Sequence, residues 1–204
     1  TITLISQRVG KSTAYLETLP AGEGILDVVG PLGHPAEITD VKNVVCIGGG
    51  IGVAPIFPIA QAFRKKGCRV VSIIGARTKD LIILADEMRS VSDQVHIITD
   101  DGSSGNKGFV TDALRQLVKG GETFDQAVAI GPIPMMSATA RLTRELGIPT
   151  MVSLNSLMVD GTGMCGACRV TVGGETRFTC VDGPEFDGHK VDFEELMHRL
   201  QMFR

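Results

Sequence analysis

The sequence predicts an α/β fold whose centre is a five-stranded parallel sheet. Two observations predict it: apolar runs alternate with amphipathic segments through the middle of the chain, and glycines and prolines separate them. Near-continuous apolar strands separated by helices indicate a parallel sheet that is covered on both faces. We expect three parts: residues 1–40 are the remnant of a β-barrel domain, residues 41–155 an α/β domain, and residues 156–204 a small cysteine-containing subdomain.

The amino-terminal part has the pattern of β-structure. Two β-like runs, T-I-T-L-I-S-Q-R and G-I-L-D-V-V-G-P-L-G, are separated by a glycine-containing loop and a short apolar turn. These runs are too few to close a barrel. We therefore expect residues 1–40 to be the carboxyl-terminal piece of a β-domain.

Strands and helices alternate from Asn43 onward. The apolar runs predict strands over 43–48, 69–75, 94–99, 125–131 and 150–154, and the amphipathic segments predict helices near 54–66, 79–90, 109–119 and 134–146. After the cysteine loop we expect two short strands over 169–172 and 175–179. A final helix should begin at Asp192, and no stop signal precedes Arg204.

Composition excludes several classes of partner. The 204 residues carry a formal net charge of −3 and no basic block, so we expect neither nucleic acid nor an anionic membrane surface as a partner. The longest apolar stretch, 44–60, is broken by glycines and prolines, which argues against a membrane span. No signal peptide precedes it. Five cysteines, three of them grouped, suit a reducing cytoplasm, where we expect the protein to reside.

The cysteine loop is the most informative motif. It reads D-G-T-G-M-C-G-A-C, followed after eleven residues by Cys180. With a cysteine in place of Asp160, this would be the C-x4-C-x2-C…C spacing that binds a 2Fe-2S cluster in plant-type ferredoxins. The intervening glycines allow a tight loop and leave N–H groups free to face sulfur. We therefore predict that Asp160, Cys165, Cys168 and Cys180 hold a 2Fe-2S cluster.

Three other interpretations remain open for these residues. The three cysteines and His189 have the ligand types of a zinc site. Cys165 and Cys168 could form a thiol–disulfide pair, although such pairs belong at a helix start and Cys168 leads into a strand-like run. Asp160 could be an ordinary turn residue, because Asp-Gly pairs are common in turns.

A glycine-rich loop ends the first predicted strand of the parallel sheet, with the sequence I-G-G-G-I-G-V-A-P. Such a turn lets the backbone approach a pyrophosphate at the positive end of a helix. The predicted nucleotide contacts here are Gly49, Gly50, Gly52, Ala54 and Pro55. Because alanine and proline stand where a third Rossmann glycine would be, a tight turn without a ligand remains an alternative.

Two later strand ends support a nucleotide site. They are T-D-D-G-S-S-G, which contains Asp101 and Gly102, and A-I-G-P-I-P-M-M, which contains Gly131 and Pro132. The carboxyl ends of parallel strands share the edge where open α/β sheets bind ligands. We therefore expect all three loops to frame one nucleotide.

A further phosphate-binding pattern lies in the amino-terminal part. Gly10, Lys11, Ser12 and Thr13 precede a possible helical turn, so their hydroxyl and N–H groups could bind phosphate. An ordinary hairpin loop is the alternative. A β-domain for flavin, an α/β domain for nicotinamide and a metal cluster together make a path for electrons, since a flavin can split hydride pairs into single electrons.

These motifs resemble the ferredoxin–NADP reductase superfamily, in the branch that holds the electron-transfer subunit of dihydroorotate dehydrogenase B. The resemblance rests on G-G-G-I-G-V-A-P, D-D-G-S-S-G-N-K-G-F-V-T-D, I-G-P and the cysteine loop, and it covers essentially all 204 residues. Dihydroorotate enzymes are expected to use four cysteines. Asp160 with three cysteines is more similar to the small (alpha) subunits of NADH-dependent ferredoxin:NADP oxidoreductases, also described as sulfide dehydrogenase subunits.

The resemblance implies cofactor roles for two groups of residues. Ser12 and Thr13, with the strand of Ile5, Ser6 and Gln7, would hold the pyrophosphate and adenosine side of FAD. The glycine loop and the Gly131-Pro132 turn would frame NAD(H). The arginine-containing flavin motif of the family is expected just upstream of Thr1, outside this sequence, so we expect weak FAD binding or none from these residues alone.

The resemblance also implies a function. The chain would pass electrons between NAD(H), FAD and the 2Fe-2S cluster to a larger, glutamate-synthase-like flavoprotein subunit that handles ferredoxin and NADP. The alternatives are the electron-transfer role in dihydroorotate dehydrogenase B and a non-catalytic redox sensor. No catalytic side chain is expected, because hydride transfer to flavin needs no protein acid. Asp100 and Asp101 are therefore expected to have a loop role.

Overall fold

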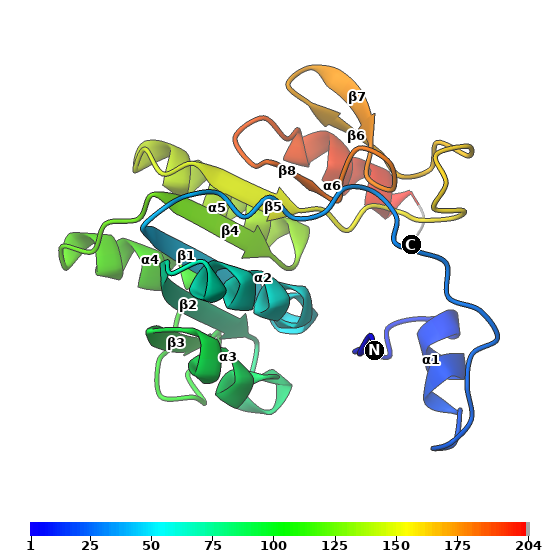
Figure 1. Ribbon diagram of the computed structural model, residues 1–204, viewed down its shortest axis with the longest axis horizontal. Helices are drawn as coiled ribbons and strands as arrows, with labels where there is room; N and C mark the ends of the chain where they lie inside the picture. The colour runs from blue at the N-terminus through cyan, green and yellow to red at the C-terminus, as the bar shows by residue number, and fades with distance from the viewer. Residues whose placement is uncertain (203–204) are drawn as a thin grey trace.

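The computed structural model of the protein describes residues 1–202 and has a six-stranded sheet at its centre (Figure 1). Its strands are β1 (Asn43–Gly49), β2 (Arg69–Ala76), β3 (Gln94–Thr99), β4 (Gln126–Ile130), β5 (Thr150–Ser153) and β8 (Glu185–Asp187). The order across the sheet is β3-β2-β1-β4-β5-β8. The first five strands run parallel, as the sequence predicts.

The sixth strand was not predicted. β8 pairs antiparallel with β5, where Phe186 lies opposite Val152. With three residues it is too short to show a strand periodicity. It joins the cysteine-containing subdomain to the edge of the large sheet.

Helices cover both faces of the sheet. Alternate residues of β1 separate the two cores: Val44 and Cys46 face the side of α2 (Val53–Lys65) and α3 (Ala85–Val91), whereas Val45 and Ile47 face the side of α4 (Val110–Lys119) and α5 (Ile133–Glu145). The helix predicted over 79–90 is wrong in its first half. A short 3-10 turn, η2 (Lys79–Leu81), is followed by Leu84 at φ 53, a left-handed conformation that no helix continues through.

The strands expected within residues 1–40 do not form. This segment contains the helix α1 (Lys11–Glu17) and otherwise one isolated bridge between Ala21 and Glu23. Most of its large apolar side chains are open to solvent, with Ile2 82% and Leu26 100% exposed, whereas Ala36 and Ile38 pack against the core on the α2 side. An extended run needs partner strands to become a sheet, and this segment pairs with no strand of the sheets in the described chain. Figure 1 shows α1 standing apart from the sheet.

The carboxyl-terminal subdomain follows the prediction closely. The hairpin of β6 (Arg169–Val172) and β7 (Glu175–Phe178) turns at Gly173 and Gly174, whose φ angles are 62° and 83°. Two consecutive positive φ angles match a type I′ turn, which glycine accepts at no steric cost. The helix α6 (Phe193–Gln201) then packs Leu196 into the core on the α5 side. The predicted continuation of this helix to Arg204 reaches beyond the described residues.

No helix in residues 1–202 is both long enough and apolar enough to cross a membrane.

Asp192 caps α6, because its carboxylate accepts a hydrogen bond from the Glu195 N–H at 2.9 Å. We expect Asp192→Ala to lower the free energy of unfolding by about 1 kcal/mol, since the cap satisfies an otherwise free donor. Urea denaturation measures this value. Asp80→Ala, at an exposed carboxylate of η2, should change it by less than about 0.5 kcal/mol. Equal effects of the two substitutions would contradict the assigned cap.

Candidate cofactor sites

The glycine loop at the end of β1 packs so closely against the loop after β4 that a side chain would clash. The strand runs through η1 (Gly50–Gly52) directly into α2. A Cβ atom on Gly52 would lie 2.6 Å from the Ile130 carbonyl carbon, and one on Gly49 would lie 3.1 Å from Pro132 Cδ. Such distances are below ordinary contact, so only glycine fits at these places. Gly50 lies between them at φ 54 with open space where a Cβ atom would be, so its backbone is open to close approach, as a pyrophosphate site requires.

The loop after β4 meets this glycine loop. A Cβ atom on Gly131 would lie 3.0 Å from the Gly49 carbonyl oxygen, and Pro132 is the residue that precedes α5. Met135 contributes its side chain to the same cluster, packed against Gly49 and Gly131. The structure thus brings the predicted residues Gly49, Gly52, Gly131 and Pro132 together, with Gly50 between them in the chain and Ala54 and Pro55 in the first turn of α2.

The Asp101-Gly102 loop lies at the same sheet edge, after β3. Its Asp101 carboxylate accepts hydrogen bonds from the Ser103 hydroxyl at 2.7 Å and the Ser103 N–H at 2.9 Å. These bonds lower the pKa of Asp101, the hydroxyl contributing most. The Lys79 N–H donates to the Ser103 hydroxyl at 2.8 Å, which ties this loop to the end of β2. The carboxylate therefore organises its own loop.

Cys168 and Cys180 form the buried half of the cysteine site. Cys168 immediately precedes β6 and Cys180 lies just after β7, so the hairpin places the two sulfurs 3.2 Å apart. The side chains are 2% and 5% exposed. Two thiolates on one tetrahedral metal would lie about 3.8 Å apart if each metal–sulfur bond were about 2.3 Å. The two sulfurs would therefore need to move only slightly apart for both to bind one iron.

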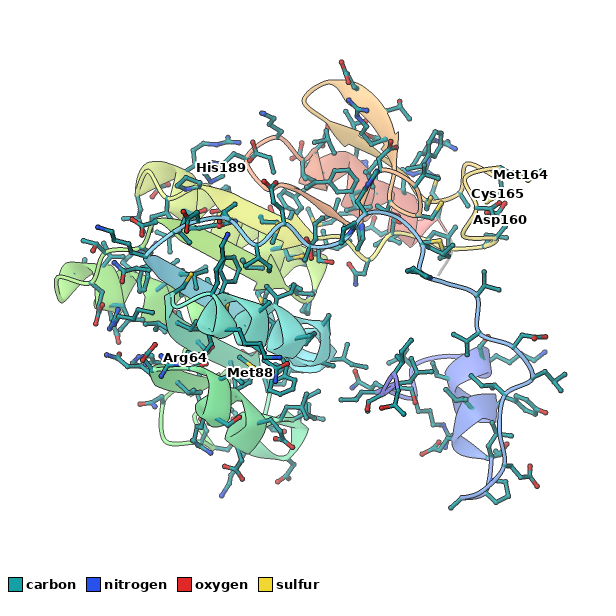
Figure 2. The ribbon with its side chains drawn as sticks, in the orientation of Figure 1. Arg64, Met88, Asp160, Met164, Cys165 and His189 are labelled. Atoms are coloured by element: carbon teal, nitrogen blue, oxygen red, sulfur yellow. The ribbon has the colours of Figure 1, made fainter. Side chains whose placement is uncertain are left out.

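Asp160 and Cys165 form the exposed half. The Asp160 carboxylate accepts hydrogen bonds from the N–H groups of Thr162 at 2.7 Å and Cys165 at 2.9 Å. The bond from Thr162 contributes most to lowering the pKa of Asp160, so the group is a carboxylate at neutral pH. Figure 2 shows Asp160 and Cys165 side by side on one loop, with Met164 beside them.

The four predicted ligands thus form two pairs. In residues 1–202, no three acidic, cysteine or histidine side chains converge on a single point. A mononuclear site needs such convergence, whereas a 2Fe-2S cluster takes two protein ligands on each of its two irons. The two halves are near each other: a Cβ atom on Gly163, between Asp160 and Cys165, would lie 2.6 Å from Val181 Cγ2, and Val181 follows Cys180. The donor set and its pairing fit the cluster.

The core cysteine Cys46 lies on β1, in the core on the α2 side and away from the cysteine loop. Burial, reinforced by Cys68, raises the pKa of Cys46 to about 12, so it stays a protonated core residue as the sequence suggests. The pKa of Cys168 is lowered although burial opposes this, because hydrogen bonds from Cys180 favour its thiolate. Metals bind the thiolate form.

The zinc interpretation with His189 is wrong. His189 Nε2 lies 3.1 Å from the Thr143 hydroxyl on α5, and Figure 2 places His189 at the opposite side of the molecule from Cys165. The thiol–disulfide interpretation also fails. The sulfur next to Cys168 belongs to Cys180, and all five cysteines are free.

The predicted FAD residues lie away from both sites. Ile5 to Gln7 precede α1, and Lys11 to Thr13 form its first turn after Gly10. The Thr13 hydroxyl accepts hydrogen bonds from the N–H groups of Val9 at 3.0 Å and Gly10 at 3.1 Å. Figure 1 shows this helix separated from the sheet, so the structure does not bring the FAD residues to the nucleotide edge. Their role stays a prediction.

Comparison with known proteins identifies two family domains and a close relative. Residues 46–141 match the oxidoreductase NAD-binding domain, and residues 155–192 match the iron-sulfur cluster binding domain of dihydroorotate dehydrogenase B. A Thermotoga maritima protein described as a dihydroorotate dehydrogenase B (NAD(+)) electron transfer subunit homolog is 51% identical over 201 residues, which are 98% of this chain and 71% of the relative. The chain belongs to the family of dihydroorotate dehydrogenase B electron-transfer subunits.

Other relatives agree with this assignment. A probable electron transfer subunit of dihydroorotate dehydrogenase B from Methanocaldococcus jannaschii is 39% identical over 91% of this chain and 70% of its own length. The solved structure of an NADH-dependent reduced ferredoxin-NADP oxidoreductase aligns with a TM-score of 0.91 and 50% identity, over 98% of this chain and 71% of that chain. The resemblance, the fold class and the cofactor set of iron–sulfur cluster, NAD and FAD are confirmed. Family members of this kind are electron-transfer subunits with a larger catalytic partner.

Two arginines that contact the cluster loop were not predicted from the sequence. Arg169, the first residue of β6, and Arg199 in α6 donate hydrogen bonds to backbone carbonyls between Cys165 and Cys168. A single arginine carries no spacing signal, and the contact of Arg199 depends on how α6 folds back. No sequence pattern could have identified it.

Asp160→Cys tests the fourth ligand. If Asp160 binds iron, the cluster should persist while its absorption spectrum and potential change, because a thiolate is a softer ligand than a carboxylate. Absorption and electron paramagnetic resonance (EPR) spectra of the reduced protein measure this change. Asp182→Cys is the matched control, since that carboxylate accepts a hydrogen bond from the Phe178 N–H at 2.7 Å in the same subdomain. Spectra unchanged by Asp160→Cys would show that Asp160 is not a ligand.

Proposed function

We propose that this electron-transfer subunit passes electrons between NAD(H), FAD and a 2Fe-2S cluster, and works with a larger glutamate-synthase-like flavoprotein subunit on ferredoxin and NADP. The observation that carries the proposal is Asp160, a carboxylate at the place where the dihydroorotate enzymes are expected to have a fourth cysteine. The 50% identity to an NADH-dependent reduced ferredoxin-NADP oxidoreductase supports it.

The residues of the chain have distinct parts in this proposal. Gly49, Gly52 and Gly131 let the two loops pack together, Gly50 lets the backbone approach the pyrophosphate of NAD(H), and the start of α2 supplies N–H groups for it. Asp160 with Cys165, and Cys168 with Cys180, each bind one iron. The residues from Ile5 to Gln7 and from Gly10 to Thr13 contribute to the FAD site. When bound, the flavin and the cluster convert hydride pairs into single electrons.

A second candidate is the electron-transfer role in dihydroorotate dehydrogenase B. The descriptions of the Thermotoga and Methanocaldococcus relatives favour it, as does the family matched by residues 155–192. Both candidates use the same cofactors in this subunit. They differ in the partner subunit and in its substrate.

Purification of the native complex separates the candidates. Full-length protein with an affinity tag, expressed in its own host, should retain a glutamate-synthase-like flavoprotein, and the complex should oxidise NADPH with ferredoxin and NAD present. Recovery of an FMN protein that oxidises dihydroorotate would establish the second candidate. The grouped cysteines suit reducing conditions, which supports the cytoplasm as the location of the subunit.

A further inference from the structure

One peptide unit of the cluster loop connects a cation to a predicted iron ligand. The Ala167 N–H donates a hydrogen bond to Cys165 Sγ at 3.4 Å, and the carbonyl oxygen of the same peptide, that of Gly166, accepts from Arg169 Nη1 at 3.4 Å. A donor at the carbonyl end polarises the peptide and strengthens the bond that its N–H makes. The positive charge of Arg169 thereby strengthens the hydrogen bond from the Ala167 N–H to Cys165 Sγ.

A second arginine holds the next peptide unit, which joins Ala167 to Cys168. Arg199 Nη2 donates to the Ala167 carbonyl oxygen at 3.1 Å, and this peptide continues into Cys168. Arg199 comes from the last turns of α6, so a helix far along the chain holds the loop. Both carbonyls between Cys165 and Cys168 therefore accept a hydrogen bond from a guanidinium group.

The charges of these two arginines are not cancelled nearby. The ion pairs of residues 1–202 involve other arginines and lysines, and neither Arg169 nor Arg199 takes part in one. Arg199 is half-buried, and solvent screens a partly buried charge less than an exposed one. Arginine also stays protonated at every physiological pH. Two fixed positive charges thus contact the loop between the two cysteines.

Net charge and hydrogen bonds to sulfur set the reduction potential of an iron–sulfur cluster. Reduction adds a negative charge, which a nearby cation stabilises. We propose that Arg199 and Arg169 are positioning residues that hold the carbonyls between Cys165 and Cys168 and raise the reduction potential of the cluster. This inference deepens the proposed function and rests on its cluster site.

Arg199→Met tests the inference, because methionine keeps an unbranched side chain and removes the charge and the donors. Full-length wild-type and variant proteins are titrated anaerobically with redox dyes, and the EPR signal of the reduced cluster is followed. At a fixed potential near the midpoint we expect the reduced-to-oxidised ratio to fall about tenfold, which corresponds to about 59 mV for a one-electron couple. Arg169→Met should shift the ratio in the same direction by less, since its bond is longer.

Arg115→Met is the matched control. Arg115 lies on α4, away from the cysteine loop (Figure 1), and its loss changes the net charge of the chain equally. A titration unchanged by Arg115→Met and shifted by Arg199→Met supports the inference. Equal shifts in both variants, or no shift in Arg199→Met, would overturn it.

Iron analysis distinguishes a failure of this inference from a failure of the proposed function. Wild-type protein without iron would refute the cluster and with it the proposed function, whereas iron-loaded wild type and an unshifted Arg199→Met refute this inference alone. If Arg199→Met fails to fold, Arg199→Lys replaces it. Lysine keeps the charge but not the planar fork, so we expect a smaller shift in the same direction. A wild-type potential together with a wild-type EPR spectrum in Arg199→Lys would overturn the inference.

Discussion

Cys168→Ala is expected to remove the iron–sulfur cluster. Cys168 and Cys180 have buried sulfurs 3.2 Å apart, and alanine leaves the second thiol without a partner on the same iron. Even the loss of a group that only orients a ligand costs about 10- to 100-fold in metal affinity, so loss of a ligand should lower the iron content at least about tenfold. Iron analysis of anaerobically purified full-length protein measures this loss, and absorption in the visible range should fall with it.

Cys46→Ala is the control for the cysteine experiment. Cys46 is a thiol on β1, buried in the core on the α2 side and away from the cysteine loop. The variant should unfold more easily because a buried atom is lost, yet it should keep its iron. Full iron content in Cys168→Ala, or equal iron loss in both variants, would contradict the assigned ligand.

Gly52→Ala is expected to damage both stability and nucleotide binding. The added Cβ would lie 2.6 Å from the Ile130 carbonyl carbon and 2.8 Å from Gly131 Cα, and neither backbone atom can move aside as a flexible side chain can. Overpacking of this kind costs about 1–3 kcal/mol in the free energy of unfolding. Separation of the glycine loop from the β4 loop should also weaken NADH binding by at least about tenfold, since close backbone approach is lost.

Urea denaturation and titration with NADH, followed by fluorescence, measure the two effects of Gly52→Ala. Gly24→Ala is the control, because a Cβ there meets nothing within 4 Å, and the unfolding free energy should change by less than about 0.5 kcal/mol. A Gly52→Ala protein that is destabilised but binds NADH with unchanged affinity would show that the loop is a structural turn alone.

The sequence predicted those features that depend on local patterns. The five parallel strands were predicted because each is a continuous apolar run, and β1 shows why: Val44, Val45, Cys46 and Ile47 are all buried, on alternating faces. The meeting of Gly49 with Gly131 followed from the rule that parallel strands end at one edge. The ligand spacing around Cys165 likewise needs no tertiary information.

The features that the sequence did not predict depend on contacts between distant segments. β8 has only three residues, and it is a strand because β5 offers an edge beside it. The strands expected within residues 1–40 do not form, because no partner strand lies beside them, and Leu26 is fully exposed. Arg199 reaches the Ala167 carbonyl across 32 positions of sequence, through the fold of α6.

The central claim is that this subunit carries electrons through a 2Fe-2S cluster held by Asp160, Cys165, Cys168 and Cys180. The most direct test is the absorption and EPR spectrum of anaerobically purified full-length protein, before and after dithionite, with iron and zinc quantified. We expect an iron content of about two per chain, which is that of one 2Fe-2S cluster, and a rhombic EPR signal on reduction. A colourless protein with one zinc per chain would contradict the claim and remove the electron path with it.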